Sequence, residues 1–356
     1  MPLNSHCEIR PARGNDQLQW DTYVANHPRG GGYHFWGFKK AITAAYGFSG
    51  VYLMALVGGR IRGVLPLIHI HLPWMRGGLF SLPYCDAAGP LADSTAIERA
   101  LILGASSHAR EHGIHTLEIR SSRPLSGGWT NGARNPGKVK MSMALPSHPD
   151  ALLASLKSKV RSQVKKPMRD GLGVCLGGRE LLKDFHNIYC ENMRDLGSPA
   201  HSMKWFSEIF KGYGNRAHVG LVRLSDGRPA AAGIILCHPR QVSIPWASSL
   251  RRFNRFNPNM LLYWQFLSFA ILRGYPSFDF GRSTPGEGSF KFKAQWGAMG
   301  SSLHWVKSRM ASENGVRVGF PSGPLDYRSL GARALSKTPV PLLKWIGSQT
   351  RRFISL

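Results

Sequence analysis

The sequence predicts a mixed α/β protein built from two halves with the same order of elements. Its 356 residues suggest two domains. Hydrophobic residues make up 43% of the chain, which is normal for a folded globular protein and too high for a disordered one. Strand-like and helix-like patterns alternate along the chain, and one segment of the first half has a counterpart in the second.

The first half contains a hairpin with helices on either side. Hydrophobic spacing predicts helices over 15–26, 34–46 and 96–112, and strands over 51–57, 60–70 and 116–121. Gly58 and Gly59 lie between the first two strands, and such a pair is typical of a tight hairpin turn.

The second half repeats this order. Helices are expected over 179–196, 202–213 and 258–273, and strands over 219–224, 229–237, 241–248 and 277–281. Asp226 and Gly227 give a second hairpin signal. Residues 113–122 share a pattern with residues 274–283, including one acid, and each segment follows a helix of similar length. This favours an internal duplication over chance similarity.

These patterns divide the chain into a first domain over 1–150, a second over 151–310 and a tail over 311–356. Residues 339–353 of the tail could form a basic amphipathic helix, with Leu342, Trp345, Ile346 and Gln349 on one side. Peripheral contact with an anionic membrane and packing onto the body are the two alternatives. Packing is the commoner fate and is preferred.

Composition narrows the class of partner. The formal net charge of +26 favours polyanions such as RNA, phosphorylated lipid carriers, nucleotide sugars or anionic membrane, with simple solubility as the alternative; DNA is not expected. No apolar run approaches the 20 or so residues of a membrane span, and the N-terminus lacks a secretory pattern. Five scattered cysteines without CxxC spacing indicate a reduced, cytoplasmic chain. His69 and His71 have no companion acid or cysteine in sequence, so no metal site is expected.

Residues 246–297 are the richest in candidate site residues, because polar side chains there follow strands or begin helices. Those that could bind substrate or phosphate are Trp246, Arg251, Asn259, Tyr263, Arg282, Ser283, Lys291 and Lys293. Asn259 could instead cap the next helix. Asp279 either orients a substrate amine or forms a salt bridge with Arg282.

Two groups of cations also stand out. Lys291 and Lys293 alternate with phenylalanines, which in a strand would put both lysines on one face, either to bind an anion or simply to be solvated. Arg161, Lys165 and Arg169 would form a stripe on a helix within the basic stretch 157–171. Because like charges repel, we expect these five cations to converge with Arg251 and Arg282 on one cleft that holds an anion.

The stretches 157–171, 246–251, 259–264, 278–283 and 290–297 together resemble the Fem (FemAB) family of aminoacyl and peptidyl transferases. With 81–84 and 192–197 they resemble most closely the branch associated with exosortase/PEP-CTERM and exopolysaccharide loci. The resemblance implies two tandem acetyltransferase-like (GNAT) domains and transfer of an aminoacyl group from a charged tRNA to an amine. It covers residues 8–307 or so.

The resemblance also implies roles for particular residues. Asp93 falls in a stretch, 88–93, that looks like the family's GPxxD, so it is a candidate base or amine-orienting acid; its alternative role is the cap of the helix after it. Lys291 and Lys293 would contact the phosphates of the donor. The chain has neither a long heptad arm for tRNA nor the [QR]xxGx[GA] pattern of acetyl-CoA enzymes, so aminoacyl-tRNA and acyl-CoA both stay open as donors.

The function that follows is an acyltransferase that needs no cofactor, metal or covalent enzyme intermediate. It would form an amide bond on an amine of a cell-envelope precursor, such as one of peptidoglycan, or of an exopolysaccharide precursor. One alternative is an acyl-CoA-dependent N-acyltransferase. The other is a non-catalytic module that binds an anionic polysaccharide or a lipid-linked precursor.

Overall fold

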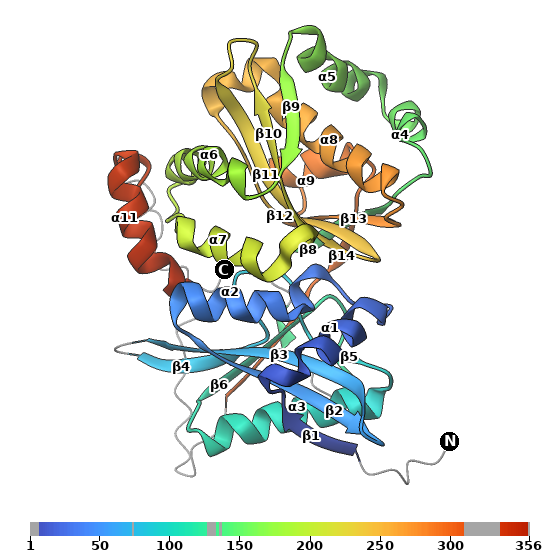
Figure 1. Ribbon diagram of the computed structural model, residues 1–356, viewed down its shortest axis with the longest axis vertical. Coiled ribbons are helices and arrows are strands. Elements are labelled where there is room, and N and C mark those ends of the chain that lie inside the picture. The colour runs from blue at the N-terminus through green and yellow to red at the C-terminus, as the bar shows by residue number, and fades with distance from the viewer. Residues whose placement is uncertain (1–6, 73–74, 127–132, 135–136, 310–334, 355–356) are drawn as a thin grey trace.

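The computed structural model describes residues 7–72, 75–126, 133–134, 137–309 and 335–354. It has two lobes stacked along the long axis, each built around one mixed sheet (Figure 1). Among the described helices, none has the length and hydropathy to cross a bilayer.

The first lobe contains a sheet in the order β1-β2-β3-β4-β6-β15-β7, with β5 paired to β3. Its strands are β1 (Cys7–Pro11), β2 (Ser49–Val57), β3 (Arg60–Leu72), β4 (Met75–Phe80), β5 (Leu91–Ala92), β6 (Thr116–Ser121), β7 (Ala133–Arg134) and β15 (His304–Arg309). Its helices are α1 (Gln17–Asn26), α2 (Trp36–Tyr46) and α3 (Thr95–Glu111). Helix α3 packs on one face of the sheet, where Leu101 and Ala105 join Leu65 and Leu67 of β3 in a core.

The second lobe contains a sheet in the order β14-β8-β13-β12-β11-β10-β9. Its strands are β8 (Val139–Ala144), β9 (Gly173–Gly177), β10 (Ala217–Arg223), β11 (Pro229–His238), β12 (Gln241–Ser249), β13 (Ser277–Ser283) and β14 (Met299–Ser302). Its helices are α4 (Pro149–Ser155), α5 (Ser158–Arg169), α6 (Leu182–Asp195), α7 (Met203–Tyr213), α8 (Pro258–Leu272) and α9 (Gly288–Ala294).

The two sheets have the same topology, as the sequence repeat predicts. In each, three antiparallel strands lead through a helix to a strand that pairs parallel with the third. Glu118 on β6 pairs with Phe80, and Asp279 on β13 pairs with Ser243. The two acids of the sequence repeat therefore occupy the same place in their sheets.

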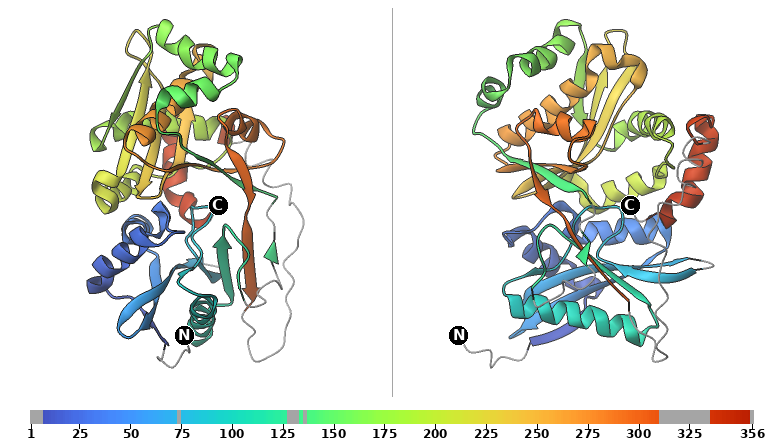
Figure 2. Two further views of the ribbon diagram at one scale, coloured as in Figure 1. Left: turned by 90° about the vertical axis from the view of Figure 1, so that its right-hand side faces the viewer. Right: turned by 180° about the vertical axis from the view of Figure 1, so that it is seen from behind.

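The lobes exchange strands close to the two predicted domain boundaries. Strand β8 belongs to the second sheet, although the division at residue 150 assigns it to the first domain. Strand β15 returns to the first sheet, directly after β14 in the second, and Figure 2 shows this segment running from one lobe to the other. Within the described residues up to Arg309 the chain therefore crosses between the lobes twice, and each crossing ends in a strand that is hydrogen-bonded into the sheet it joins.

A close helix crossing also joins the lobes. Helix α2 of the first lobe packs on α7 of the second (Figure 1). A Cβ atom on Gly37 would lie 2.5 Å from the carbonyl oxygen of Gly212, so only glycine fits this approach. Beside it the rings of Phe38 and Trp205 pack edge to face, with centroids 5.5 Å apart.

The tail packs onto the body, as preferred, but through a different face from the one expected. Helix α11 (Val340–Thr350) lies against α6. Leu343 and Gly347 are buried, whereas Leu342 and Trp345 of the expected apolar side are exposed. A Cβ on Gly347 would lie 2.3 Å from the carbonyl oxygen of Ala200, so the missing side chain lets the helix approach closely.

Candidate functional site

The candidate site lies where two parallel strands of the second sheet separate. Strands β12 and β13 pair at only two positions, Val242 with Phe278 and Ser243 with Asp279. Beyond them β13 bends, because Gly281 has a φ of 70° and the pairing with β8 shifts register between Asp279 and Arg282. The gap beyond the paired ends of parallel strands is a common place for ligand binding.

A loop of the first lobe inserts an acid into this gap. A Cβ on Gly281 would lie 3.5 Å from Oδ2 of Asp86, which belongs to the loop between β4 and β5. Leu82 and Tyr84 in this loop have φ values of 63° and 66°, which are unfavourable for side chains of their size. The Trp305 indole donates to the carbonyl oxygen of Asp86 at 3.0 Å and so helps to hold the loop in place.

Asp86 forms the ion pair that the sequence assigned to Asp279. The backbone N–H of Arg282 donates to Oδ2 of Asp86 at 2.9 Å, and its guanidinium Nε lies 3.3 Å from Oδ1. Burial raises the pKa of Asp86, while the Arg282 charge opposes that shift. Asp279 instead pairs with Lys140, whose Nζ lies 3.2 Å from its Oδ2, and accepts the N–H of Gly281. The expected Asp279–Arg282 salt bridge is therefore wrong.

Lys293 is the buried cation of the site. The two lysines do not share a strand face, because residues 290–293 lie in α9, a helix that turns Lys293 inward and leaves Lys291 exposed. Lys293 Nζ donates to the carbonyl oxygen of Arg282 at 2.7 Å. Burial lowers the pKa of Lys293 to about 8, against the opposing effect of Asp86 and Asp279. An ammonium with this pKa can give up and regain a proton near neutral pH.

Two hollows meet at Asp86. The first, which we call the cleft, has a volume of about 380 Å³ and contains Asp86, Trp246, Tyr263 and Lys293 among its lining residues, with Arg351 from the tail at one side. The second, of about 260 Å³, contains Lys140 and Asp279 and residues 28–34. Tyr33 and Asp86 line both hollows, so a group at Asp86 can be reached from two sides.

The structure brings together only some of the predicted site residues. Trp246, Tyr263, Arg282 and Lys293 line the cleft. Lys291 lines a different hollow, at the junction of α4 and α5. The seven cations therefore do not converge on one cleft.

The remaining members of that cation set lie elsewhere. Arg161 donates to the carbonyl oxygens of Ala154 and Leu156. Arg251 donates to the carbonyl oxygen of Asp195 at 3.1 Å. Lys165 and Arg169 are exposed on α5, whose opposite side is buried.

The structure also shows where three other predicted site residues lie. Asp93 lines neither hollow: it accepts from the Tyr23 hydroxyl at 2.8 Å and pairs with Arg62, while Ser94 caps α3. Helix α8 begins at Pro258 with Asn257 at the N-cap position, so the interpretation of Asn259 as a cap is wrong. The hydroxyl of Ser283 is buried and has no hydrogen-bond partner among the described residues.

Sequence reasoning missed Asp86 and Lys140. Asp86 stands in a Gly- and Pro-rich loop of the first lobe, seven positions before Asp93, and Lys140 lies on a strand with no charge pattern. Asp86 reaches the site because the lobes pack together, whereas Lys140 reaches Asp279 because β8 pairs with β13 in the second sheet. The one signal available was that Asp86 lies between the two stretches, 81–84 and 88–93, that carry part of the family resemblance.

Comparisons with known proteins agree with this architecture. Residues 156–294 match the family described as "Acetyltransferase (GNAT) domain", which identifies a GNAT-type acyltransferase domain in the second lobe. No curated protein sequence matches the chain.

Several solved structures are similar. FemX is 16% identical with a TM-score of 0.69, over 84% of this chain and 97% of FemX. A tandem GNAT protein from the clavulanic acid biosynthesis pathway is 15% identical with a TM-score of 0.55, over 87% of this chain and all (100%) of that one. The C-terminal domain of a proposed lysylphosphatidylglycerol synthetase from Agrobacterium fabrum is 12% identical with a TM-score of 0.58, over 85% of this chain and 93% of that domain. At these identities the likeness shows the fold, and the predicted pair of tandem GNAT-like domains is confirmed.

Proposed function

We propose that this protein transfers an aminoacyl or peptidyl group from an activated ester to an amine on a cell-envelope or exopolysaccharide precursor. The observation that carries the proposal is that one cleft, at the separated strands, is lined both by a carboxylate with a raised pKa, Asp86, and by a buried lysine with a pKa of about 8, Lys293. Amide formation needs a group that accepts the proton of the amine and one that stabilises the oxyanion.

In the proposed reaction the amine nitrogen attacks the ester carbonyl carbon, and its proton passes to the Asp86 carboxylate. The Lys293 ammonium hydrogen-bonds to the developing oxyanion and gives its proton to the departing oxygen as the carbon–oxygen bond breaks. The products are an amide and a free hydroxyl. Proton exchange with solvent then returns Asp86 and Lys293 to their starting forms.

The two hollows support a two-substrate reaction. Because Asp86 lines both, a donor in one hollow and an acceptor amine in the other could meet at its carboxylate. The net charge of +26 favours an anionic donor, either aminoacyl-tRNA or acyl-CoA, and an anionic acceptor. We place the protein in the cytoplasm, with peripheral contact at the inner membrane face, in keeping with the exosortase-associated branch that the sequence resembles.

The test is product formation from labelled alanyl-tRNA and an amine-bearing muropeptide nucleotide. Lys293→Met and Asp86→Asn should each lower kcat by about 100-fold or more, the typical contribution of a general acid or base. Lys293→Arg keeps the charge but cannot lose its proton, so it should restore little activity. Asp93→Asn is the control and should retain activity. Full activity in both Lys293→Met and Asp86→Asn would refute the proposed chemistry.

A second candidate is an acyl-CoA-dependent N-acyltransferase, which the match of residues 156–294 to an acetyltransferase family favours. Calorimetry with coenzyme A separates the two. Tight binding of coenzyme A, together with transfer from an acyl-CoA and none from aminoacyl-tRNA, would favour this candidate. A binding module instead predicts precursor binding that survives Asp86→Asn, with no product from any donor.

A further inference from the structure

We propose that His108, Glu111 and His112 form a binding site for a divalent transition-metal ion of the zinc class, and that His69, on the face of β3 that packs against α3, contributes to it. The site lies at the C-terminal end of α3 in the first lobe and shares no residue with the cleft or the second hollow. The proposal does not depend on the reaction of the protein.

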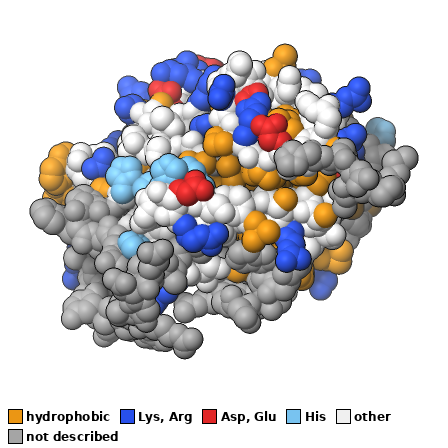
Figure 3. All heavy atoms as spheres, turned by 90° about the horizontal axis from the view of Figure 1, so that it is seen from below, with side chains coloured by type: hydrophobic (Ala, Val, Ile, Leu, Met, Phe, Trp, Pro, Cys, Tyr) orange, Lys and Arg blue, Asp and Glu red, His pale blue; other side chains and the backbone are white. Residues whose placement is uncertain are grey.

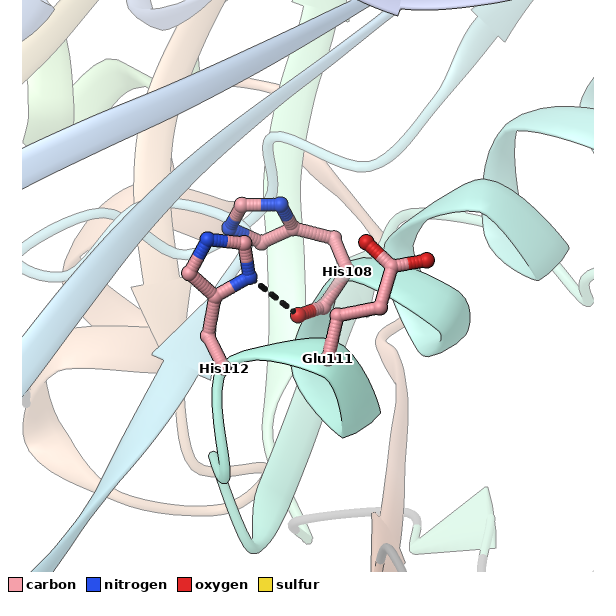
Figure 4. A group of neighbouring side chains, drawn as sticks. All are labelled: His108, Glu111 and His112. Carbon is pink, nitrogen blue, oxygen red and sulfur yellow. Dashed lines mark hydrogen bonds between the residues drawn. The ribbon is translucent and has the colours of Figure 1, made fainter.

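The first argument is the arrangement of the donor atoms. His108 and His112 are one helical turn apart, so their rings lie on the same face of α3, and Figure 4 shows Glu111 beside them. One ligand atom from each residue lies within 4.8 Å of the others. Tetrahedral zinc with bonds of about 2.05 Å separates its ligands by about 3.4 Å, so side-chain rotations alone could close the set.

The second argument is the orientation of one imidazole. His112 Nδ1 lies 2.9 Å from the carbonyl oxygen of His108 (Figure 4). A ring nitrogen facing a carbonyl oxygen must carry the proton, which leaves Nε2 of His112 as a lone-pair donor. Metal-bound histidines usually have this kind of second hydrogen bond, which fixes the ring and its tautomer.

The third argument is that strand β3 brings more histidine to the same place. Leu65 and Leu67 face α3 in the core, and side chains alternate along a strand, so His69 and His71 continue the face toward the end of α3. The His69 and His71 rings are 5.2 Å apart, so both histidines lie together at this end of β3. No acid or cysteine accompanies His69 and His71 in the sequence, but the fold packs this face of β3 against α3, which carries His108 and Glu111.

The chemistry of the set selects the metal. Imidazole nitrogens with one carboxylate suit zinc, nickel or copper, and do not suit calcium or magnesium, which prefer oxygen ligands. Among the described residues, the Glu111 carboxylate and the His108 ring nitrogens have no hydrogen bond or ion pair with another side chain. Glu111 and His112 are exposed and His108 is half-buried, so an ion has access from solvent. Figure 3 shows histidine side chains next to an acidic one on the lower face of the molecule.

The test is titration of chelator-treated, tag-free full-length protein with zinc sulfate in a calorimeter. The wild type should bind one ion, and the double variant His108→Ala/His112→Ala should bind it at least about 100-fold more weakly. Even residues that only hydrogen-bond to metal ligands change metal affinity by about 10- to 100-fold, so loss of two ligands should cost at least as much. Glu111→Gln and His69→Ala should each weaken binding to a smaller extent. His115→Ala, three residues beyond the set, is the matched control and should bind as the wild type does.

Two further measurements keep the test decisive. Circular dichroism checks that the double variant is folded, and cobalt added in place of zinc should give visible bands in the wild type alone. Zinc should also raise the melting temperature of the wild type and leave that of the double variant unchanged, because a bound ion would join β3 to α3. No saturable zinc binding by the wild type, or unchanged binding by the double variant, would overturn the proposal.

Discussion

Replacing Lys293 by methionine should stabilise the protein at pH 7 even as it removes most of the proposed activity. Only 9% of this lysine is exposed, and burial lowers its pKa from 10.5 to about 8. At about 1.4 kcal/mol per pKa unit, holding it charged in the folded state costs about 3 kcal/mol. Methionine removes that cost but loses the hydrogen bond to the carbonyl oxygen of Arg282, worth about 1 kcal/mol. The net gain expected in the free energy of unfolding is about 2 kcal/mol.

The stability advantage of Lys293→Met should decrease as the pH rises. Below pH 8 the lysine is protonated in both the folded and unfolded states, so the wild type bears the full cost of the buried charge. Between about 8 and 10.5 the unfolded lysine keeps its proton while the folded one loses it, so wild-type stability rises with pH. The methionine variant lacks this rise. Its advantage should therefore fall to near zero by about pH 10.

Urea unfolding followed by circular dichroism, at pH 7 and pH 10, measures this difference. Lys291→Met is the matched control, because Lys291 is exposed on the same helix and should change stability by less than about 0.5 kcal/mol. Tyrosines and cysteines also titrate between pH 7 and pH 10, but their effect on stability cancels when each variant is compared with the wild type at the same pH. A Lys293→Met variant that is less stable than the wild type at pH 7, or an advantage that is the same at both pH values, would refute the buried-charge argument.

Three other predictions concern residues outside the proposed pair of reacting groups. Asp93→Asn should keep kcat within about twofold and lower the free energy of unfolding by at most about 1 kcal/mol, because exposed ion pairs such as Asp93–Arg62 stabilise a protein only weakly. A large loss of turnover would show that Asp93 takes part in the reaction. Replacing all five cysteines should leave turnover intact in variants that circular dichroism shows to be folded, because burial raises the pKa of the Cys85 thiol and keeps it protonated. Gly347→Ala should loosen α11, because the new Cβ would overlap the carbonyl oxygen of Ala200, and limited proteolysis should then cut the tail faster. Unchanged proteolysis would show that α11 does not depend on this contact.

The elements of the fold were largely predictable because they depend on local patterns. The strand expected over 116–121 is β6 itself, and the helix expected over 258–273 is α8 within one residue. The repeated acid in residues 113–122 and 274–283 predicted the shared topology, since Glu118 and Asp279 hold equivalent positions in the two sheets. The local pattern was misleading at Lys293. Its alternation with phenylalanine suits a strand, but the segment is a helix. Lys293 and Trp296, three residues apart, are both buried, which is the spacing of one helix face.

The sequence by itself determined the tandem α/β architecture, the cationic character and several cleft residues, because spacing and composition fix which faces are buried. Only the tertiary structure decided the chemistry of the site. Asp86 and Arg282 are 196 residues apart, and their ion pair exists because a first-lobe loop enters the gap between two second-lobe strands. The pKa of Lys293 likewise depends on burial among side chains from both lobes. A pKa is set by the solvent and charges around a group in space, and one-dimensional spacing does not contain that information.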